Sequence, residues 1–211
     1  MIARLFKKTT TIHSAPERAP QATNAQPNDD ANDNVADKKI GNVALPILGD
    51  RSIMRRKAYG TSSVPIQTDL RWKVDPTLAN RIANFNRHGA ERSGYHDSRS
   101  VSFWRSARKQ FFADGAKQPL VFYDSNTGKP LFRAPVGRSW ESFEKESRSH
   151  GWPSFRDAEV VWENVRCLRD GESVSVDGTH LGHNLPDRSG NRYCINLVSV
   201  AGRPRPGTVE E

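Results

Sequence analysis

The chain has 211 residues, a mean hydropathy of -0.74 and a formal charge of +8 at pH 7. A chain of this length and polarity can supply one modest core, so we expect one folded domain together with a polar segment. No stretch approaches the roughly 20 apolar residues of a membrane helix, and no apolar signal-peptide core follows Met1, which argues against membrane spanning and secretion.

Residues 1–66 form the polar segment. They contain no Trp, and Phe6 and Tyr59 are their only aromatic residues, whereas Asn, Asp, Ala, Pro, Ser and Thr are abundant. Such a composition buries too little surface to offset the entropy cost of ordering. We therefore expect a disordered basic tail over 1–66, one domain over 67–203 and a flexible C-terminal tail over 204–211.

The first 16 residues bear on the cellular compartment. Residues 1–16 carry basic and hydroxyl side chains but no acid, as organelle transit peptides do, although an ordinary basic tail has the same composition. The two cysteines lack the spacing of a disulfide framework and fit a reducing compartment. We expect a cytoplasmic protein, or a mitochondrial or plastid one if this segment is a transit peptide.

The positive charge does not indicate a nucleic-acid partner. From residue 67 onward, Lys and Arg do not cluster with stacking aromatic residues as a nucleic-acid groove requires. We expect a solvated basic surface and a monomer with no nucleic-acid or membrane partner.

Two short helices are expected ahead of or between the strands. Asp75, followed by a first-turn proline, offers a helix start, and Gly89 offers the end, which leaves Asn84 facing solvent. Ser139 offers the start of a second helix that Gly151 ends.

Two hairpins follow from β-rich runs with turn residues between them. The runs 120–123 and 130–132 are separated by a Gly-containing turn, and the runs 159–168 and 173–176 are separated by an Asp-Gly turn. Short helices followed by short antiparallel strands indicate an α+β domain that is mainly antiparallel β.

The strand around Cys194 carries the most chemistry. Alternation places Arg192, Cys194 and Asn196 on one face and three apolar residues on the other. A cysteine in a strand is by itself more often a small buried apolar residue. Here a guanidinium and an amide flank the thiol, and His180 and His183 lie shortly upstream, so the site has the ingredients for a lowered thiol pKa and for proton delivery.

Three motifs together resemble the methionine-(R)-sulfoxide reductase B family in their order and residue type. The motifs are Gly151-Trp152-Pro153-Ser154-Phe155, Gly178-Thr179-His180-Leu181-Gly182-His183 and Arg192-Tyr193-Cys194-Ile195-Asn196. The resemblance covers roughly residues 74–201. It implies the two-sheet β-fold of these reductases, with short N-terminal helices, and an oxidoreductase that converts free or peptide-bound methionine-(R)-sulfoxide to methionine.

The resemblance also implies a role for each motif residue. Cys194 is expected to be the nucleophile and to pass through a sulfenic acid. His180 and His183 are expected to donate protons, Arg192 to hold the thiolate and Asn196 to orient the site.

A substrate pocket is implied by the same motifs. Trp152 is expected to pack on the substrate methyl group, with Phe155 as a further substrate-binding residue. The family usually has Val-Phe after the second motif His, whereas this chain has Asn184-Leu185. Leu185 partly replaces that apolar wall, so we expect an altered substrate preference.

Regeneration of the thiol departs from the family pattern. In the family, the cysteine that forms a disulfide with the nucleophile most often stands at the position that His150 occupies here. This leaves Cys167 as the only internal candidate for a disulfide with Cys194. The alternative is direct reduction by an external thiol such as thioredoxin, glutaredoxin or glutathione.

The metal site also departs from the family pattern. Many members bind a structural zinc through two Cys-x-x-Cys pairs, one in the first hairpin and one before the His-Leu-Gly-His motif, and neither pair exists in this chain. We expect no metal and no cofactor.

Two other function classes remain open at this point. The chain is alternatively a catalytically idle binding module on the same β-fold, although a pure binder has no need for the thiol, imidazole and indole groups together. A third alternative is a peroxide-reactive thiol sensor, in which Cys194 reacts faster with peroxide than with a sulfoxide.

Overall fold

The computed structural model describes residues 39–40, 43–86, 95–113 and 115–205, with side chains from residue 44 onward. The predicted transit segment 1–16, the helix end at Gly89 and the C-terminal tail beyond residue 205 lie outside the described residues. No helix in the described ranges is long and apolar enough to cross a membrane.

Strands outnumber helices in the described chain. In chain order the helices and strands are β1 (Lys39–Ile40), β2 (Val43–Ala44), α1 (Pro76–Asn80), α2 (Phe103–Ala113), β3 (Leu120–Tyr123), β4 (Pro130–Ala134), α3 (Trp140–His150), β5 (Ser154–Phe155), β6 (Val165–Cys167), β7 (Glu172–Ser175), β8 (His180–Asn184) and β9 (Tyr193–Ile195). Short 3-10 turns and one π-helical turn, Arg81–Phe85, connect several of these elements.

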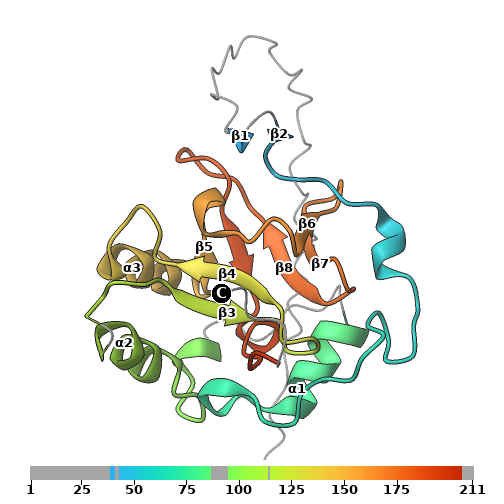
Figure 1. Ribbon diagram of the computed structural model, residues 1–211, viewed down its shortest axis with the longest axis horizontal. Helices are drawn as coiled ribbons and strands as arrows, with labels where there is room; N and C mark the ends of the chain where they lie inside the picture. The colour runs from blue at the N-terminus through green and yellow to red at the C-terminus, as the bar shows by residue number, and fades with distance from the viewer. Residues whose placement is uncertain (1–38, 41–42, 87–94, 114, 206–211) are drawn as a thin grey trace, which may run out of the picture. The chain divides into compact units, whose positions relative to one another are not determined.

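All strand pairs in these sheets are antiparallel. β1 pairs with β2, β3 pairs with β4, and a five-stranded sheet has the order β5-β9-β8-β7-β6. Figure 1 shows the hairpin β3–β4 beside this larger sheet, with α1 and α2 on the other side of the hairpin. The predicted α+β class with mainly antiparallel strands is confirmed.

Local capping explains where helix α3 begins and ends. The side chain of Ser139 accepts a hydrogen bond from the backbone N–H of Ser142, which satisfies one free donor of the first turn. Gly151 ends the helix in the left-handed conformation at φ 76°, which favours glycine. Both predicted ends of this helix are confirmed.

The predicted helix after Asp75 is shorter and differs in its exposed face. Asp75 caps α1 through the backbone N–H of Thr77, but α1 ends at Asn80 and the chain continues as the π-helical turn. Asn84 is only 2% exposed, so its predicted exposure is wrong. Its side-chain amide is drawn inward because it hydrogen-bonds to Asn126 of the β3–β4 turn.

An aromatic core lies between the β3–β4 hairpin, α3 and one face of the five-stranded sheet. Phe132 of β4 stacks on Phe155 of β5 with ring centroids 4.3 Å apart. Phe122 of β3 and Phe143 of α3 contact the same Phe155 ring at 4.9 and 5.6 Å. This packing fixes the inner face of β5 and leaves its other face available for the site.

Residues 44–66 are ordered along the edge of the five-stranded sheet. The backbone N–H of Gly49 donates to the Cys167 carbonyl at 2.8 Å, and the Cys167 N–H donates to the Ile47 carbonyl at 2.9 Å. Met54 is buried at 4% exposure. The prediction of a disordered tail is therefore wrong for 44–66, because residues 47–49 pair with the edge strand β6 and Leu45, Ile47 and Ile66 pack against the core.

Candidate active site

Four residues from four neighbouring strands lie in one row across the larger sheet. Glu172 pairs with His183, His183 pairs with Cys194, and Cys194 pairs with Ser154. Directly paired residues project from the same face of a sheet. We call Glu172, His183, Cys194 and Ser154 the active-site row.

Cys194 occupies the centre of this row with polar neighbours. The guanidinium of Arg192 donates a hydrogen bond to its Sγ, and the Ser154 hydroxyl lies 3.9 Å from the same sulfur. The flanking residues Tyr193 and Ile195 are fully buried in the core on the opposite face. The predicted alternation along the strand therefore holds, and Cys194 is outside the apolar cluster.

Both motif histidines lie on the Cys194 face. His183 is exposed, whereas His180 is only 2% exposed, and their ring centroids are 5.6 Å apart. An irregularity in the β7–β8 register precedes Val174 and brings the His180 ring towards the row, where its Nδ1 lies 2.8 Å from the Glu172 carboxylate. When Nδ1 of the neutral ring carries the proton and donates it to this carboxylate, Nε2 is free of hydrogen and can accept a hydrogen bond.

The charge state of the thiol differs from the sequence-based expectation. Burial raises the pKa of the Cys194 thiol above its ordinary value, while the charge of Arg192 and the hydrogen bonds from Ser154 and Arg192 lower it by less. This direction is opposite to the lowered pKa that the neighbouring residues suggested from the sequence.

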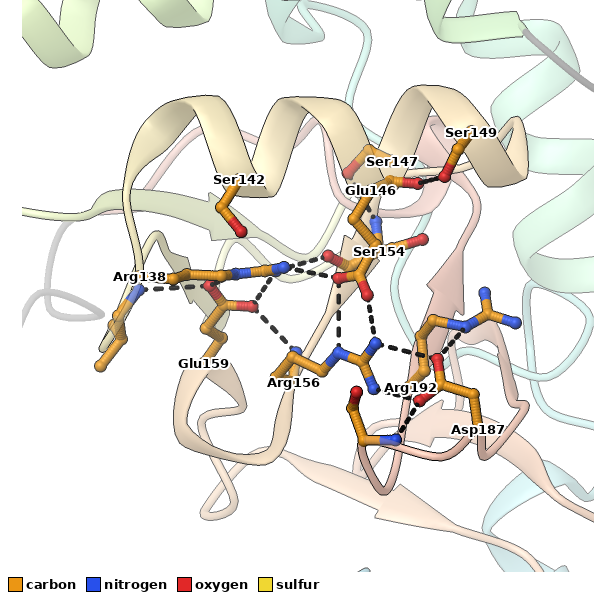
Figure 2. A network of polar contacts seen from close by, with 12 residues as sticks. Arg138, Ser142, Glu146, Ser147, Ser149, Ser154, Arg156, Glu159, Asp187 and Arg192 are labelled. Carbon is orange, nitrogen blue, oxygen red and sulfur yellow. Dashed lines mark hydrogen bonds and ion pairs between the residues drawn. The ribbon is translucent and has the colours of Figure 1, made fainter.

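Arg192 belongs to a chain of ion pairs that continues away from the thiol (Figure 2). Its Nε donates to Asp187 at 3.2 Å, and Asp187 also pairs with Arg156 at 2.9 Å. Arg156 then pairs with Glu146. Hydrogen bonds from Arg156 are the main cause that lowers the pKa of the Asp187 carboxyl to about 2. Asp187 therefore stays ionised and holds the guanidinium beside the sulfur.

Sequence reasoning did not identify Asp187 or Arg156 as parts of the site. Arg156 follows the Trp-containing motif directly, and Asp187 lies in the turn before β9. The one signal for this ion pair in the sequence is an acidic residue within a few positions of Arg192. Such closeness in sequence does not show that the two side chains are in contact.

Three further predicted site residues, Trp152, Leu185 and Asn196, lie near Cys194 in the fold. Trp152 is half-buried and lies next to the row, because its carbonyl accepts a hydrogen bond from the Ser154 hydroxyl at 3.0 Å. Leu185, after β8, is 49% exposed, and its N–H donates to the Arg192 carbonyl. Asn196 is 4% exposed at the end of β9. These positions place the backbone of all three residues next to Cys194 or its strand partners.

Phe155 is not brought to this face. It pairs with Tyr193 in the β5–β9 register, is fully buried and belongs to the aromatic core. The predicted contact between Phe155 and substrate is therefore wrong, because the alternation that exposes Ser154 to the site turns Phe155 inward.

Cys167 is not placed to form a disulfide with Cys194. Register partners connect Cys167 through Ser173 and Gly182 to Ile195, which is the row on the opposite face. Two strands lie between β6 and β9, which is a separation of roughly 14 Å at about 4.8 Å per strand, whereas a disulfide needs Cα atoms about 5.5 Å apart. Burial also raises the pKa of the Cys167 thiol to about 11. The predicted resolving role is wrong.

The residues at the first hairpin turn do not fit a thiolate zinc site. The chain's two cysteines lie elsewhere, and the buried carboxylate of Asp124 instead accepts hydrogen bonds from the Thr179 hydroxyl at 3.0 and 2.9 Å. Asn126 joins the same cluster through Thr179 and Asn84. A hydrogen-bonded cluster thus connects the hairpin to the residue that precedes His180.

One other group of potential metal ligands lies near the row. Glu146, His150 and Asp187 have ligand atoms within 4.8 Å of one another. Both carboxylates already pair with Arg156, so a guanidinium supplies the positive charge that a cation would bring. We assign no metal to this group.

Several known proteins have sequences similar to this chain. No family model matches the chain. A Methanosarcina mazei protein, "Peptide methionine sulfoxide reductase MsrB", is 30% identical over 111 residues, which are 46% of this chain and 79% of that protein. A Pseudomonas putida protein of the same name is 36% identical over 86 residues, covering 39% of this chain and 53% of that protein.

A vertebrate relative has a similar name. The Danio rerio protein "Methionine-R-sulfoxide reductase B2, mitochondrial" is 36% identical over 72 residues, covering 26% of this chain and 40% of that protein. The chain thus spans about half or less of the Danio and Pseudomonas relatives, and more than two thirds of the Methanosarcina relative.

Proposed function

This chain belongs to the methionine-(R)-sulfoxide reductase B family, and from that premise we propose that it reduces methionine-(R)-sulfoxide, free or peptide-bound, to methionine. The observation that carries the proposal is the active-site row, in which one thiol has a guanidinium on its sulfur and an imidazole directly opposite. A thiol and a proton donor on one face are what sulfoxide reduction needs.

Cys194 acts as the nucleophile in this proposal. Its sulfur takes the sulfoxide oxygen, so the thiol becomes a sulfenic acid while the sulfoxide sulfur gains two electrons and leaves as a thioether. The thiol releases its proton as the sulfur attacks, and one proton from an imidazole ends on the oxygen of the sulfenic acid, so one proton is lost and one is gained and no other reactant is needed for this half-reaction. His183, opposite Cys194, protonates the sulfoxide oxygen as the sulfur attacks.

Burial of the thiol supports a coupled ionisation. Because the pKa of the Cys194 thiol is raised by burial, a stable thiolate does not wait in the empty site. Arg192 instead stabilises negative charge on the sulfur as it develops, with Asp187 holding the guanidinium in place. His180 is hydrogen-bonded to Glu172 and lies beside His183, so it can pass a proton to His183 or hold one next to it.

Trp152 and Leu185 are the proposed substrate contacts. Trp152 is half-buried beside Ser154 and offers an indole surface to the S-methyl group. Leu185 is exposed at the rim and accounts for a substrate preference that differs from that of relatives with an aromatic residue there. Asn196 orients the groups at the end of β9.

An external thiol regenerates the enzyme. A first thiol condenses with the sulfenic acid to give a mixed disulfide and water, and a second thiol then releases Cys194 as the thiol together with an external disulfide. The placement of Cys167 on the opposite face, with two strands between β6 and β9, supports this route over an internal disulfide. Thioredoxin, glutaredoxin and glutathione are the candidate reductants.

We further propose that the protein works without zinc, as a monomer, and without nucleic-acid or membrane partners. The cluster around Asp124 and Thr179 supports the first point, because it already connects the two segments that a metal would join. Its compartment is proposed to be the cytoplasm, or a mitochondrion or plastid if residues 1–16 are a transit peptide.

The peroxide-sensor alternative is weaker. Peroxide reacts with thiolates, so sensor cysteines have low pKa values and open access. Cys194 is 8% exposed and its pKa is raised by burial. The idle binding module is also disfavoured, because a binding surface needs neither the row nor its ion pairs.

One single-turnover experiment tests the proposal. The reduced protein is mixed with either the R or the S sulfoxide, without reductant, and analysed by mass spectrometry. We expect only the R isomer to yield one equivalent of methionine, with one added oxygen on the Cys194 peptide. Cys194→Ser should abolish turnover, while Cys167→Ser should preserve it.

Two results would contradict the proposal. If the protein consumes neither isomer, the proposed reductase activity is contradicted. A disulfide between Cys167 and Cys194 would leave the activity standing but would overturn regeneration by an external thiol.

A further inference from the structure

Arg156 lies directly after β5, and its guanidinium joins parts of the chain that are far apart in sequence (Figure 2). Its Nη1 and Nη2 donate to the two carboxylate oxygens of Asp187 at 3.0 and 2.9 Å, and this paired geometry is the strong form of an arginine–carboxylate contact. Nη1 also donates to the carbonyls of Asn191, at 3.2 Å, and Gly190, at 3.5 Å. Arg156 therefore holds both ends of the turn that precedes β9.

The same guanidinium also contacts α3. Its Nη2 donates to Oε1 of Glu146, and its Nε donates to Oε2 of Glu146 at 3.4 Å. Glu146 also accepts from Arg138, whose Nη2 donates to the Ser154 carbonyl at 2.8 Å. The side chains of Arg156 and Glu146 are 20% and 17% exposed, so solvent screens their charges only in part. These contacts reach the active-site row at two places, Ser154 and Arg192.

Positive and negative charges alternate along this group of side chains up to the thiol. Asp187 lies between the guanidiniums of Arg156 and Arg192. Because Asp187 is shared, it neutralises less of the Arg192 charge that faces the sulfur. Burial is the main cause that raises the pKa of the Cys194 thiol, and the negative charge of Glu146 raises it further. Arg156 opposes this second effect because it pairs with Glu146 directly.

We propose that Arg156 is a positioning residue, which keeps Arg192 beside the thiol by holding Asp187. It also neutralises Glu146, whose charge otherwise opposes ionisation of Cys194. The contacts of Arg156 are with carboxylates and carbonyls, so it acts on the sulfur through Arg192. This inference rests on the proposed function in one respect, which is that Cys194 is the reacting group.

Other titratable groups lie near the same thiol. His183 pairs with Cys194 across β8 and β9, and His180 contacts Glu172 beside it. His150, at the end of α3, has a ring nitrogen within 4.8 Å of both carboxylates that Arg156 binds. The thiol is therefore studied at pH 8 and above, where free histidine is neutral and imidazole charge does not obscure the effect of the guanidiniums.

Alkylation of Cys194 in the full chain tests the role of Arg156 without any sulfoxide. The rate of reaction with iodoacetamide follows the thiolate fraction, and mass spectrometry of the Cys194 peptide measures this rate from pH 8 to pH 10. We expect Arg156→Gln to slow alkylation about three-fold at pH 8 and to move the rate profile to higher pH, because less of the thiol ionises at each pH. Arg156→Lys keeps the charge and should slow alkylation less.

A second variant should change the rate in the opposite direction. Glu146→Gln keeps an acceptor oxygen for Arg156 but removes the charge that opposes ionisation, so we expect alkylation at pH 8 to become about two-fold faster. A general loosening of the fold would instead change both variants in the same direction. Arg148→Gln is the matched control, because it removes an arginine that pairs with Glu144 of α3, and it should leave the rate unchanged.

Several outcomes would overturn this role for Arg156. They are an unchanged or faster rate in Arg156→Gln, an equal loss in Arg148→Gln, a rate in Arg156→Lys no higher than in Arg156→Gln, and an unchanged or slower rate in Glu146→Gln. The single-turnover assay tests the proposed function separately. Turnover of the R sulfoxide without the expected order of alkylation rates would reject only the role of Arg156, and the expected order without turnover would reject only the reductase activity.

Discussion

His183 lies directly across from Cys194 in the register of β8 and β9. Cβ atoms of such cross-strand partners are about 5 Å apart, so a sulfoxide held at the sulfur comes within reach of the imidazole. The exposed position of His183 allows it to exchange protons with solvent between turnovers. This relationship distinguishes His183 from the buried His180, which contacts Glu172 instead.

Replacement of His183 should therefore slow the chemical step. We expect His183→Asn to lower kcat by about 10² to 10⁴-fold, the usual range for a lost general acid, with a small change in KM. Steady-state assays with methionine-(R)-sulfoxide and dithiothreitol measure both constants. Lys145→Gln is the control, because Lys145 is exposed on α3 and outside the row. Similar losses in both variants would contradict the assignment.

The reactivity of Cys194 should depend on Arg192 and on pH. Because burial raises the thiol pKa, the thiolate fraction is below that of free cysteine at pH 8 and increases as the pH rises. Arg192→Gln removes the charge that opposes the burial effect, so the pKa should rise further. We expect alkylation of Cys194 by iodoacetamide at pH 8 to slow about tenfold, which corresponds to one pKa unit.

The matched variant for this measurement is Arg192→Lys. It keeps the positive charge, so it should slow alkylation less than Arg192→Gln does. Mass spectrometry of the Cys194 peptide separates this reaction from any at Cys167. Faster alkylation of Arg192→Gln than of the unmodified chain would show that the guanidinium does not stabilise the thiolate.

Features with local causes were predicted correctly from the sequence. Ser139 and Gly151 determine the ends of α3 through hydrogen bonds and a backbone angle within one helical turn. The Asp-Gly pair at 170–171 lies between β6 and β7, as expected for a hairpin turn. The alternation around Cys194 also depends only on neighbouring residues.

Features that depend on distant partners were predicted incorrectly. Cys167 and Phe155 face away from Cys194 because of the register of β5, β6, β7 and β8, which sequence alternation alone does not determine. The order in 44–66 comes from pairing with β6, more than 100 positions later. The raised pKa of Cys194 results from burial, which charged neighbours in the sequence do not reveal.

The cluster around Thr179 should stabilise both the fold and the site. Thr179→Val keeps the side-chain shape but removes the hydroxyl that donates to Asp124 and accepts from Asn126. We expect the free energy of unfolding to fall by about 1–3 kcal/mol, because a buried carboxylate loses a donor. Since Thr179 directly precedes His180, kcat should also fall. Urea unfolding and steady-state assays measure the two effects, with Thr68→Val, at an exposed position, as the control.

The same variant has a predicted pH dependence. Burial raises the pKa of the Asp124 carboxyl, so folding disfavours its charged form relative to the unfolded chain. The stability that this group contributes is present below its unfolded pKa and is lost as pH rises through the folded pKa. Thr179→Val should raise that pKa further, so its destabilisation should be larger at pH 7 than at pH 4. An equal loss of stability at pH 7 and pH 4 would mean that the Thr179 hydroxyl does not stabilise the charged form of Asp124.

Asp187 should act on catalysis through Arg192 with little effect on stability. Its side chain is 34% exposed, so solvent screens its ion pairs and their contribution to folding is small. Asp187→Asn removes the charge that holds Arg192 beside the sulfur, and we expect kcat to fall about tenfold or more while KM changes little. Asp69→Asn breaks an exposed pair with Arg203 that does not contact the row and should leave kcat unchanged. Hydrogen bonds from Arg156 lower the pKa of Asp187 to about 2, so its effect on activity should be lost only as the pH falls through about 2. A fall in kcat that is the same in both variants, or rescue of Asp187→Asn by higher salt alone, would show that the carboxylate does not position Arg192.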